Sequence, residues 1–169
     1  MSIILNILQY PDQGLRGKCE PVEKFDEMLH KTVSVMFDTL ESRKGSGLAA
    51  PQVGIKKRIA VVNYGQKYVL INPVILSTGE TESEMEEACL SFSGMNFTKV
   101  RRPDSLEVEA QNEDGGKFTI RADGVLAKIF HHEIEHLDGI LLIDHLSRLK
   151  REMLDKKMRK LMRKRTRKY

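Results

Sequence analysis

The sequence contains only two cysteines and has no apolar run approaching the roughly 20 residues that span a bilayer. Its first residues lack the basic leader and long apolar stretch of a secretory signal, and no internal repeat or low-complexity linker follows. We therefore expect a cytoplasmic protein without a membrane segment, whose cysteines stay reduced. A reduced cysteine can act as a metal ligand or nucleophile, but for Cys19 we expect the simpler role of a small buried apolar residue.

A chain of 169 residues fits one domain with a single core, and 40% hydrophobic with 31% charged residues is an ordinary globular balance. The formal net charge of +4 is unevenly distributed. Residues 148–169 hold twelve Lys or Arg against two acidic residues, a net of +10, so the first 147 residues carry a net charge of −6. We predict a folded domain over residues 1–147 and a basic helical tail over residues 148–169.

The spacing of apolar residues predicts an α+β fold. Residues 24–42 and 124–137 show the three- and four-residue spacing of amphipathic helices, the second with Asp123 as its N-cap and Gly139 as its stop. Between them lie four β-rich stretches, at residues 58–63, 67–72, 106–110 and 118–121. A helix, several strands and then helices indicate α+β rather than regular βαβ alternation.

A last helix is predicted from about residue 145 into the tail. Its apolar residues near one side are Leu146, Leu149, Met153, Leu161 and Met162.

Two histidines four residues apart lie in the second predicted helix, in the segment His132-Glu133-Ile134-Glu135-His136. Residues with this spacing share one helical face, so both imidazoles can reach one metal ion. Glu133 lies one step round the helix, close enough to take a proton from a water molecule without binding the ion. Because these polar groups are costly in an apolar helix unless they have partners, the pattern is unlike a chance occurrence. It predicts a metal site for hydrolysis, where a cation lowers the pKa of water and polarises a carbonyl.

A catalytic metal site also needs a third protein ligand and an open position. The longer metzincin motif fails, because Leu142 stands where its last histidine belongs. A thermolysin-like site would need a later glutamate, but Glu152 lies among lysines and arginines and is better explained as a solvated charge. Asp144 and His145 follow the helix too closely to fold back onto the site. Cys89 is the best remaining candidate, since a thiolate is a strong ligand for iron or zinc.

Three motifs resemble those of the peptide deformylases, in the same order and with similar spacing. They are Gly45-Ser46-Gly47-Leu48-Ala49-Ala50-Pro51-Gln52, Glu87-Ala88-Cys89-Leu90-Ser91 and His132-Glu133-Ile134-Glu135-His136. The segment from Tyr10 to Arg16 resembles the N-terminal part of that family, and Arg102 falls where the family usually has arginine. The resemblance covers nearly the whole chain, and three motifs together are far more specific than any one of them.

The resemblance implies antiparallel strands packed around the central helix that carries the H-E-x-x-H motif, with an N-terminal and a C-terminal helix. It implies one metal ion per chain, Fe²⁺, with zinc or nickel able to substitute, and Cys89, His132 and His136 as its ligands. The substrate would be the formyl group on the N-terminal methionine of newly made polypeptides. The products would be formate and a free amine.

The resemblance also assigns roles around the metal ligands. Glu133 would move the proton, and the developing oxyanion would be held by the Gln52 side-chain amide and the backbone N–H of Leu90. One lost donor of this kind costs about 3 kcal/mol in other enzymes. Glycine at Gly45 and Gly47 would let the backbone approach the peptide closely, because no side chain obstructs it.

From their positions on the helix, we expect Leu126, Ile129 and His132 to form the methionine pocket. Three groups are expected to lie behind the ligands and hold them: Glu87, Arg102 and Glu135.

Four residues depart from the usual family pattern, and none removes a ligand. Ala88 replaces a glycine and would be strained if that position needs a positive φ. Glu135 replaces an aspartate, and we predict that it pairs with Arg102. His131 stands where glutamine is common and is expected off the metal-facing side, while Ser93 replaces a proline and should alter the stiffness of its loop.

The basic tail has two interpretations. It is either a solvated helix surface or, through counterion release, a contact for ribosomal RNA. The residues of that contact would be Arg159, Lys160, Arg163 to Arg165, Arg167 and Lys168.

Two rival functions stay open from the sequence. One is a zinc peptidase whose third ligand is not Cys89. The other is a deformylase-like binding protein that needs no Glu133, its tail holding nucleic acid.

Overall fold

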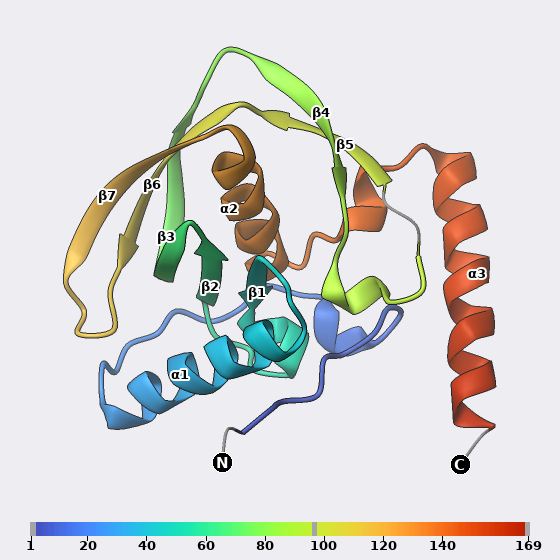
Figure 1. Ribbon diagram of the computed structural model, residues 1–169, viewed down its shortest axis with the longest axis horizontal. Helices are drawn as coiled ribbons and strands as arrows, with labels where there is room; N and C mark the ends of the chain where they lie inside the picture. Colours follow the sequence, from blue (N-terminus) through green and yellow to red (C-terminus); the bar gives the residue numbers. More distant parts are fainter. Residues whose placement is uncertain (1–2, 96–97, 168–169) are drawn as a thin grey trace.

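The computed structural model describes residues 3–95 and 98–167, which form an α+β fold with antiparallel sheets and three α-helices, as predicted (Figure 1). The helices are α1 (Glu27–Ser42), α2 (Gly124–Leu137) and α3 (Arg148–Thr166). The strands are β1 (Gly47–Ala49), β2 (Ile59–Tyr64), β3 (Gln66–Thr78), β4 (Glu82–Glu87), β5 (Thr98–Pro103), β6 (Ser105–Gln111) and β7 (Lys117–Asp123). Short 3-10 turns are η1 (Gln13–Leu15), η2 (Ala50–Val53), η3 (Leu90–Phe92) and η4 (Leu142–His145).

The strands form two antiparallel sheets. One has five strands in the order β1-β2-β3-β6-β7, and the other is the hairpin β4–β5, which arches over α2 in Figure 1. Strand β3 passes from β2 to β6 through two register shifts, and Asn72 adopts a positive φ of 51° at the first. The Asn72 side chain accepts a hydrogen bond from the Val22 N–H (2.8 Å) and donates one to the Val22 carbonyl (2.9 Å), which holds the preceding segment against this irregular point.

The larger sheet lies between two apolar cores. On one face, α1 contributes Leu29, Val33, Met36, Phe37 and Leu40, which pack against alternate strand residues such as Ile59 and Val61. On the other face, α2 contributes Ala127, Phe130 and Ile134, which pack against Ala60 and Val62. Because β2 is covered on both faces, it reads as a continuous apolar run instead of an alternating one. This sandwich fixes the position of α2.

A third core attaches α3 to the rest of the chain. Met158 is 1% exposed and packs with Tyr10 and Phe92, with Leu154 and Leu161 alongside. The Tyr10 hydroxyl donates a hydrogen bond to Asp155 (2.6 Å). Thus α3 packs on the body of the protein, and the proposed boundary at residue 148 marks a change of charge.

The predicted apolar side of the last helix is wrong in part. Leu149 and Met153 are 69% and 64% exposed, and the helix begins at Arg148 because residues 142–145 form η4. Helix α1 also begins later than predicted, at Glu27. The Asp26 carboxylate accepts a hydrogen bond from the Leu29 N–H (3.0 Å), which caps the helix there and leaves Met28 exposed.

Helix α2 has the predicted bounds. Gly139 adopts a positive φ of 75° just beyond its end, and its N–H bonds the carbonyl of His136. Asp123 occupies the N-cap position, but its side chain does not cap and pairs with Arg121 instead. Within the described residues, no helix is long and apolar enough to cross a membrane.

Candidate metal centre

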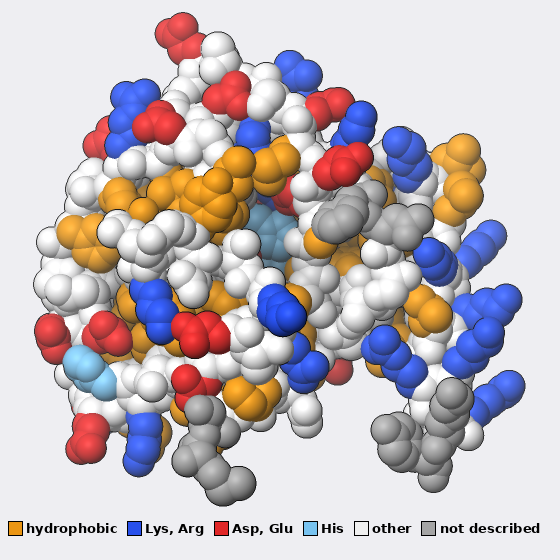
Figure 2. Space-filling model, viewed as in Figure 1, with side chains coloured by type: hydrophobic (Ala, Val, Ile, Leu, Met, Phe, Trp, Pro, Cys, Tyr) orange, Lys and Arg blue, Asp and Glu red, His pale blue; other side chains and the backbone are white. Residues whose placement is uncertain are grey.

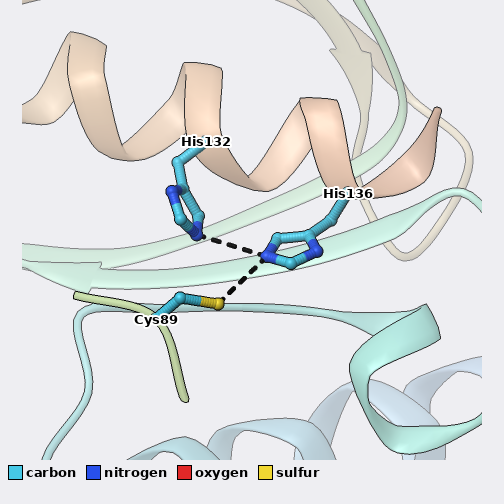
Figure 3. Close-up of side chains that lie close together, drawn as sticks. All are labelled: Cys89, His132 and His136. Carbon is cyan, nitrogen blue, oxygen red and sulfur yellow. Dashed lines mark hydrogen bonds between the residues drawn. The ribbon is translucent and has the colours of Figure 1, made fainter. Parts of the chain in front are cut away.

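Cys89, His132 and His136 converge on one point (Figure 3). The two histidines project from α2, and Cys89 follows β4 immediately before η3. The His136 Nε2 lies 3.2 Å from His132 Nε2 and 3.4 Å from Cys89 Sγ, and all three donor atoms lie within 4.8 Å of one another. The histidines are 8% and 1% exposed. The predicted trio of ligands is therefore assembled.

The donor atoms fit a transition-metal ion. The His132 Nδ1 lies 3.0 Å from a Glu87 carboxylate oxygen, an acceptor that favours the proton on this nitrogen, and the His132 Nε2 faces the centre. Within the described residues, the buried His136 Nδ1 has no hydrogen-bond partner. Two imidazoles and one thiolate are a donor set typical of zinc or iron. These residues can hold one ion and leave a coordination position free.

A buried ion-pair network lies behind His132. Arg102, 1% exposed, donates two hydrogen bonds to Glu87, at 2.6 and 3.0 Å, and one to Glu135 at 2.9 Å. Burial raises the pKa of Glu87, but hydrogen bonds from His132 and Arg102 outweigh it, so the net shift is downward. The predicted pair of Glu135 with Arg102 is present, and His131 lies in the same network, 2.7 Å from an Arg102 nitrogen. The Glu87 side chain therefore stays ionised beside His132.

Asp144 and His145 do not reach the ligand trio, as expected from the sequence. His145 Nε2 lies 2.8 Å from a Glu135 oxygen. Asp144 pairs with Arg16 and accepts a hydrogen bond from the Leu141 N–H (2.8 Å). The 3-10 turn η4 carries both residues, and its apolar residues Leu142 and Ile143 enter the third core.

Glu133 is 4% exposed, and within the described residues its Oε2 has no hydrogen-bond partner. Burial raises the pKa of Glu133 to about 7. Gly47 of β1 lies directly against it, since a Cβ on Gly47 would lie 2.4 Å from the Glu133 Oε1. The absence of a side chain at Gly47 thus gives Glu133 its space next to the ligands.

Gln52 and Leu90 lie beside Cys89. The Gln52 Oε1 accepts a hydrogen bond from the Ala49 N–H (2.8 Å), so its amide N–H₂ faces Ser91 Oγ at 3.2 Å and Cys89 Sγ at 3.5 Å. Leu90 is the first residue of η3, directly after Cys89. Both predicted oxyanion donors therefore lie beside the cysteine.

A pocket of about 400 Å³ opens onto this centre. It is seen in Figure 2 as a hollow with a histidine at its floor and hydrophobic side chains along one rim. Besides the site residues, its wall includes Gly45, Met85, Val125, Lys128 and Ile129. The wall contains the predicted Gly45 and Ile129.

We expected Leu126 to line this pocket, but this was wrong. Leu126 packs against the core of the large sheet instead. The helical period explains the position of Leu126. It also explains why Val125 and Lys128, which were not predicted from the sequence, line the pocket. These two precede His132 by seven and four residues and so share its face, whereas Leu126 points about 100° away from Val125. Met85 was missed because its strand, β4, was not predicted.

The departures from the family pattern leave this geometry intact. Among the described non-glycine residues, positive φ angles occur only at Lys44 and Asn72, so Ala88 is not strained. Ser93 has a φ of −63° directly after η3, and its N–H donates a hydrogen bond to the side-chain oxygen of Gln9.

Comparison with known proteins gives one consistent result. The family model described as polypeptide deformylase matches residues 4–152. A peptide deformylase of Neisseria gonorrhoeae is 43% identical over 161 residues, which cover 93% of this chain and 95% of that protein. A Neisseria meningitidis peptide deformylase is 42% identical with the same coverage.

Solved structures agree. A peptide deformylase of Legionella pneumophila superposes with a TM-score of 0.90 at 40% identity, covering 97% of this chain and 98% of that one. The Ehrlichia chaffeensis enzyme in complex with actinonin has a TM-score of 0.90 at 37% identity, covering 94% and 97% of the two chains.

Proposed function

The chain belongs to the peptide deformylase family of metal-dependent hydrolases, which remove the formyl group from the N-terminus of new polypeptides, and we propose that Glu133 moves the proton in this reaction. The observation that carries this role is the buried Glu133 carboxylate, whose Oε2 is unpartnered among the described residues and which lines the same pocket as Cys89 and His132. A costly group of this kind is typical of a functional site.

We propose Cys89, His132 and His136 as the metal ligands and Fe²⁺ as the native ion, with zinc or nickel able to substitute. When bound, the ion lowers the pKa of a water molecule and polarises the formyl oxygen. The close approach of one sulfur and two nitrogens supports this ligand set. The short Glu87–His132 contact keeps the proton on Nδ1 of His132 and its Nε2 free.

The other residues then divide the reaction between them. Glu133 takes a proton from the attacking water and gives it to the amine nitrogen as the carbon–nitrogen bond breaks. The Gln52 amide and the Leu90 N–H donate to the oxygen on which negative charge develops. The pocket walls formed by Met85, Val125 and Ile129 suit the side chain of methionine, because they are apolar.

The test is formate release from a formyl-methionyl peptide by anaerobically prepared, Fe²⁺-loaded protein, beside the variant Glu133→Ala. Formate from the wild type and almost none from the variant, with equal metal content, is the expected result. Full activity in the variant would remove Glu133 from the mechanism.

The rival functions predict different outcomes for two variants. A peptidase that uses another third ligand would keep its metal in Cys89→Ala, whereas our assignment predicts its loss. A binding protein would hold metal without releasing formate from any formylated peptide.

We further propose that α3 contacts ribosomal RNA, and that the protein acts in the cytoplasm, where new polypeptides emerge. Lys and Arg side chains line α3 in Figure 2, among them the exposed Arg159, Lys160 and Arg163–Arg165. The predicted contact at Lys168 lies outside the described residues. Deleting α3 would remove the buried Met158 and uncover Tyr10 and Phe92, on which it packs, so the better test is charge reversal at Arg163, Lys164 and Arg165.

The control for this test is charge reversal at three exposed lysines of the body, Lys18, Lys24 and Lys31. We expect the α3 variant to sediment with ribosomes more weakly than the wild type, and the control variant to sediment like the wild type. Equal binding by both variants would refute the contact.

A further inference from the structure

The 3-10 turn η3 carries Leu90, yet it has little stability of its own. It is three residues long, and the recorded hydrogen bond that closes it runs from the Phe92 N–H to the Cys89 carbonyl (2.9 Å). That carbonyl belongs to the same peptide plane as the Leu90 N–H, so the turn sets the direction in which this N–H points. An isolated turn of this length is marginal, because its hydrogen-bond geometry is poor. Its orientation must be fixed from outside.

The N-terminal segment supplies that support. The Leu8 N–H bonds the carbonyl of Gln52, and the Tyr10 N–H bonds the carbonyl of Ser91, both at 2.8 Å. The Tyr10 ring stacks on Phe92 with centroids 5.1 Å apart. These contacts tie one extended segment to both η2 and η3, the elements that carry the two oxyanion donors.

Between Leu8 and Tyr10, the side chain of Gln9 spans η3 from its beginning to just beyond its end. Its Nε2 donates to the Leu90 carbonyl (2.8 Å), and its Oε1 accepts from the Ser93 N–H (3.0 Å) and from the Ser93 hydroxyl. A side-chain amide carries a donor and an acceptor on one planar group, so Gln9 can bond Leu90 and Ser93 at the same time. A shorter or purely apolar side chain would leave both backbone groups of the turn without this bridge.

We propose that Gln9 is a positioning residue that holds η3, and through it the Leu90 N–H, in the orientation the reaction needs. This inference rests on the proposed role of Leu90. Gln9 touches neither substrate nor metal ligand side chains, and it acts through the turn alone. Small displacements of an aligned donor lower the rate strongly. Gln9 is not among the residues that line the pocket, so peptide binding should change little.

Ser93 makes the proposal testable by rescue. Its φ of −63° is the angle at which proline is locked, and proline is tolerated where a helix has just ended. The proline ring would occupy the place of the Ser93 N–H, so it conflicts with the present position of the Gln9 side chain but fits an alanine there. Proline can thus stiffen the end of η3 when the bridge is absent.

The experiment compares the wild type, Gln9→Ala, Ser93→Pro and the double variant, each loaded with Fe²⁺, for kcat and KM of formate release. Gln9→Ala is expected to lower kcat about tenfold with KM nearly unchanged. The double variant should recover kcat to within about threefold of the wild type, a non-additive result for two residues in contact. Asn6→Ala, at an exposed position of the same segment, is the control.

A second measurement separates positioning from general destabilisation. Hydrogen exchange of the amides of residues 89–93 should be faster in Gln9→Ala and slowed again in the double variant, with metal content and exchange elsewhere unchanged. Unchanged kcat in Gln9→Ala, or equal losses with and without proline at position 93, would overturn the proposal. If Gln9→Ala does not fold, Gln9→Glu tests the same bridge, because it keeps the acceptor for Ser93 and loses the donor to Leu90.

Failure of the proposed function would look different. Wild-type protein that holds metal but releases no formate would refute the deformylase assignment, while the exchange measurement would still decide whether Gln9 holds the turn.

Discussion

Replacing Gly47 with alanine tests whether the position of Glu133 controls the reaction. A Cβ on Gly47 would lie 2.4 Å from Glu133 Oε1 and 2.8 Å from both Cδ and Cγ. Rotating the carboxylate alone does not relieve contacts that include Cγ, so the whole side chain must retreat, by about 1 Å to reach ordinary contact distances. A shift of this size at a reacting group lowers the rate by up to about 100-fold. We therefore expect kcat to fall about 10- to 100-fold.

The cost in stability should be much smaller than the cost in rate. Overpacking a buried site costs about 1–3 kcal/mol. Gly47 does not have a positive φ, so alanine regains about 0.4–1 kcal/mol by restricting the unfolded chain. The expected net loss is about 1–2 kcal/mol.

The assay is formate release and metal content of Gly47→Ala, with urea unfolding at the same pH. The control is Ser34→Ala, at an exposed position of α1 outside the pocket, which should behave like the wild type. Wild-type kcat in Gly47→Ala, with metal fully bound, would show that Glu133 tolerates displacement and would refute this reasoning.

Four further variants test the site and the packing of α3. Cys89→Ala should retain far less than one ion per chain by elemental analysis, because a ligand is missing; stoichiometric metal would disprove its role. Arg102→Met leaves Glu87 buried without its partner and should cost about 3–5 kcal/mol in urea unfolding, a larger loss than any exposed ion pair gives. Met158→Ala should cost about 2–4 kcal/mol, whereas Leu149→Ala should change stability by less than about 0.5 kcal/mol; equal losses would contradict the orientation of α3.

The sequence predicted α2 well because its signals are local. An apolar stripe, a glycine stop at Gly139 and two histidines at helical spacing all lie within a short segment, and none depends on distant residues. The ligand trio followed from that helix once Cys89 was added, and the structure brings it together.

The hairpin β4–β5 could not be predicted in this way. Strand β4 is mostly glutamate, which has low strand propensity, and its pairing depends on the cationic strand β5. In the register, Glu84 faces Arg101 and Glu86 faces Lys99. Opposite charges across the strands stabilise a segment that looks unstructured when it is considered alone.

The predicted apolar side of α3 was wrong in part for a different reason. The helix carries two apolar series with helical spacing, one containing Leu149 and Met153 and the other containing Leu154, Met158 and Leu161. Periodicity alone does not say which series faces the protein. The choice is made by Tyr10 and its neighbours, which lie far away in sequence and pack against the second series.

The network around Arg102 is better explained by the needs of the metal site than by stability. Burying an arginine between two carboxylates carries a large desolvation cost, and apolar residues of similar volume often stabilise a core at least as well. The apolar alternative, however, offers no acceptor to His132. The Glu87 carboxylate selects the tautomer with a proton on Nδ1, and hydrogen bonds from His132 and Arg102 lower the pKa of that buried carboxylate. Glu135 preserves this arrangement although it is longer than aspartate, because its carboxylate still reaches Arg102 at 2.9 Å and lies within 2.8 Å of His145. We infer that this position is constrained by the charge its side chain delivers to Arg102 more than by the length of that side chain.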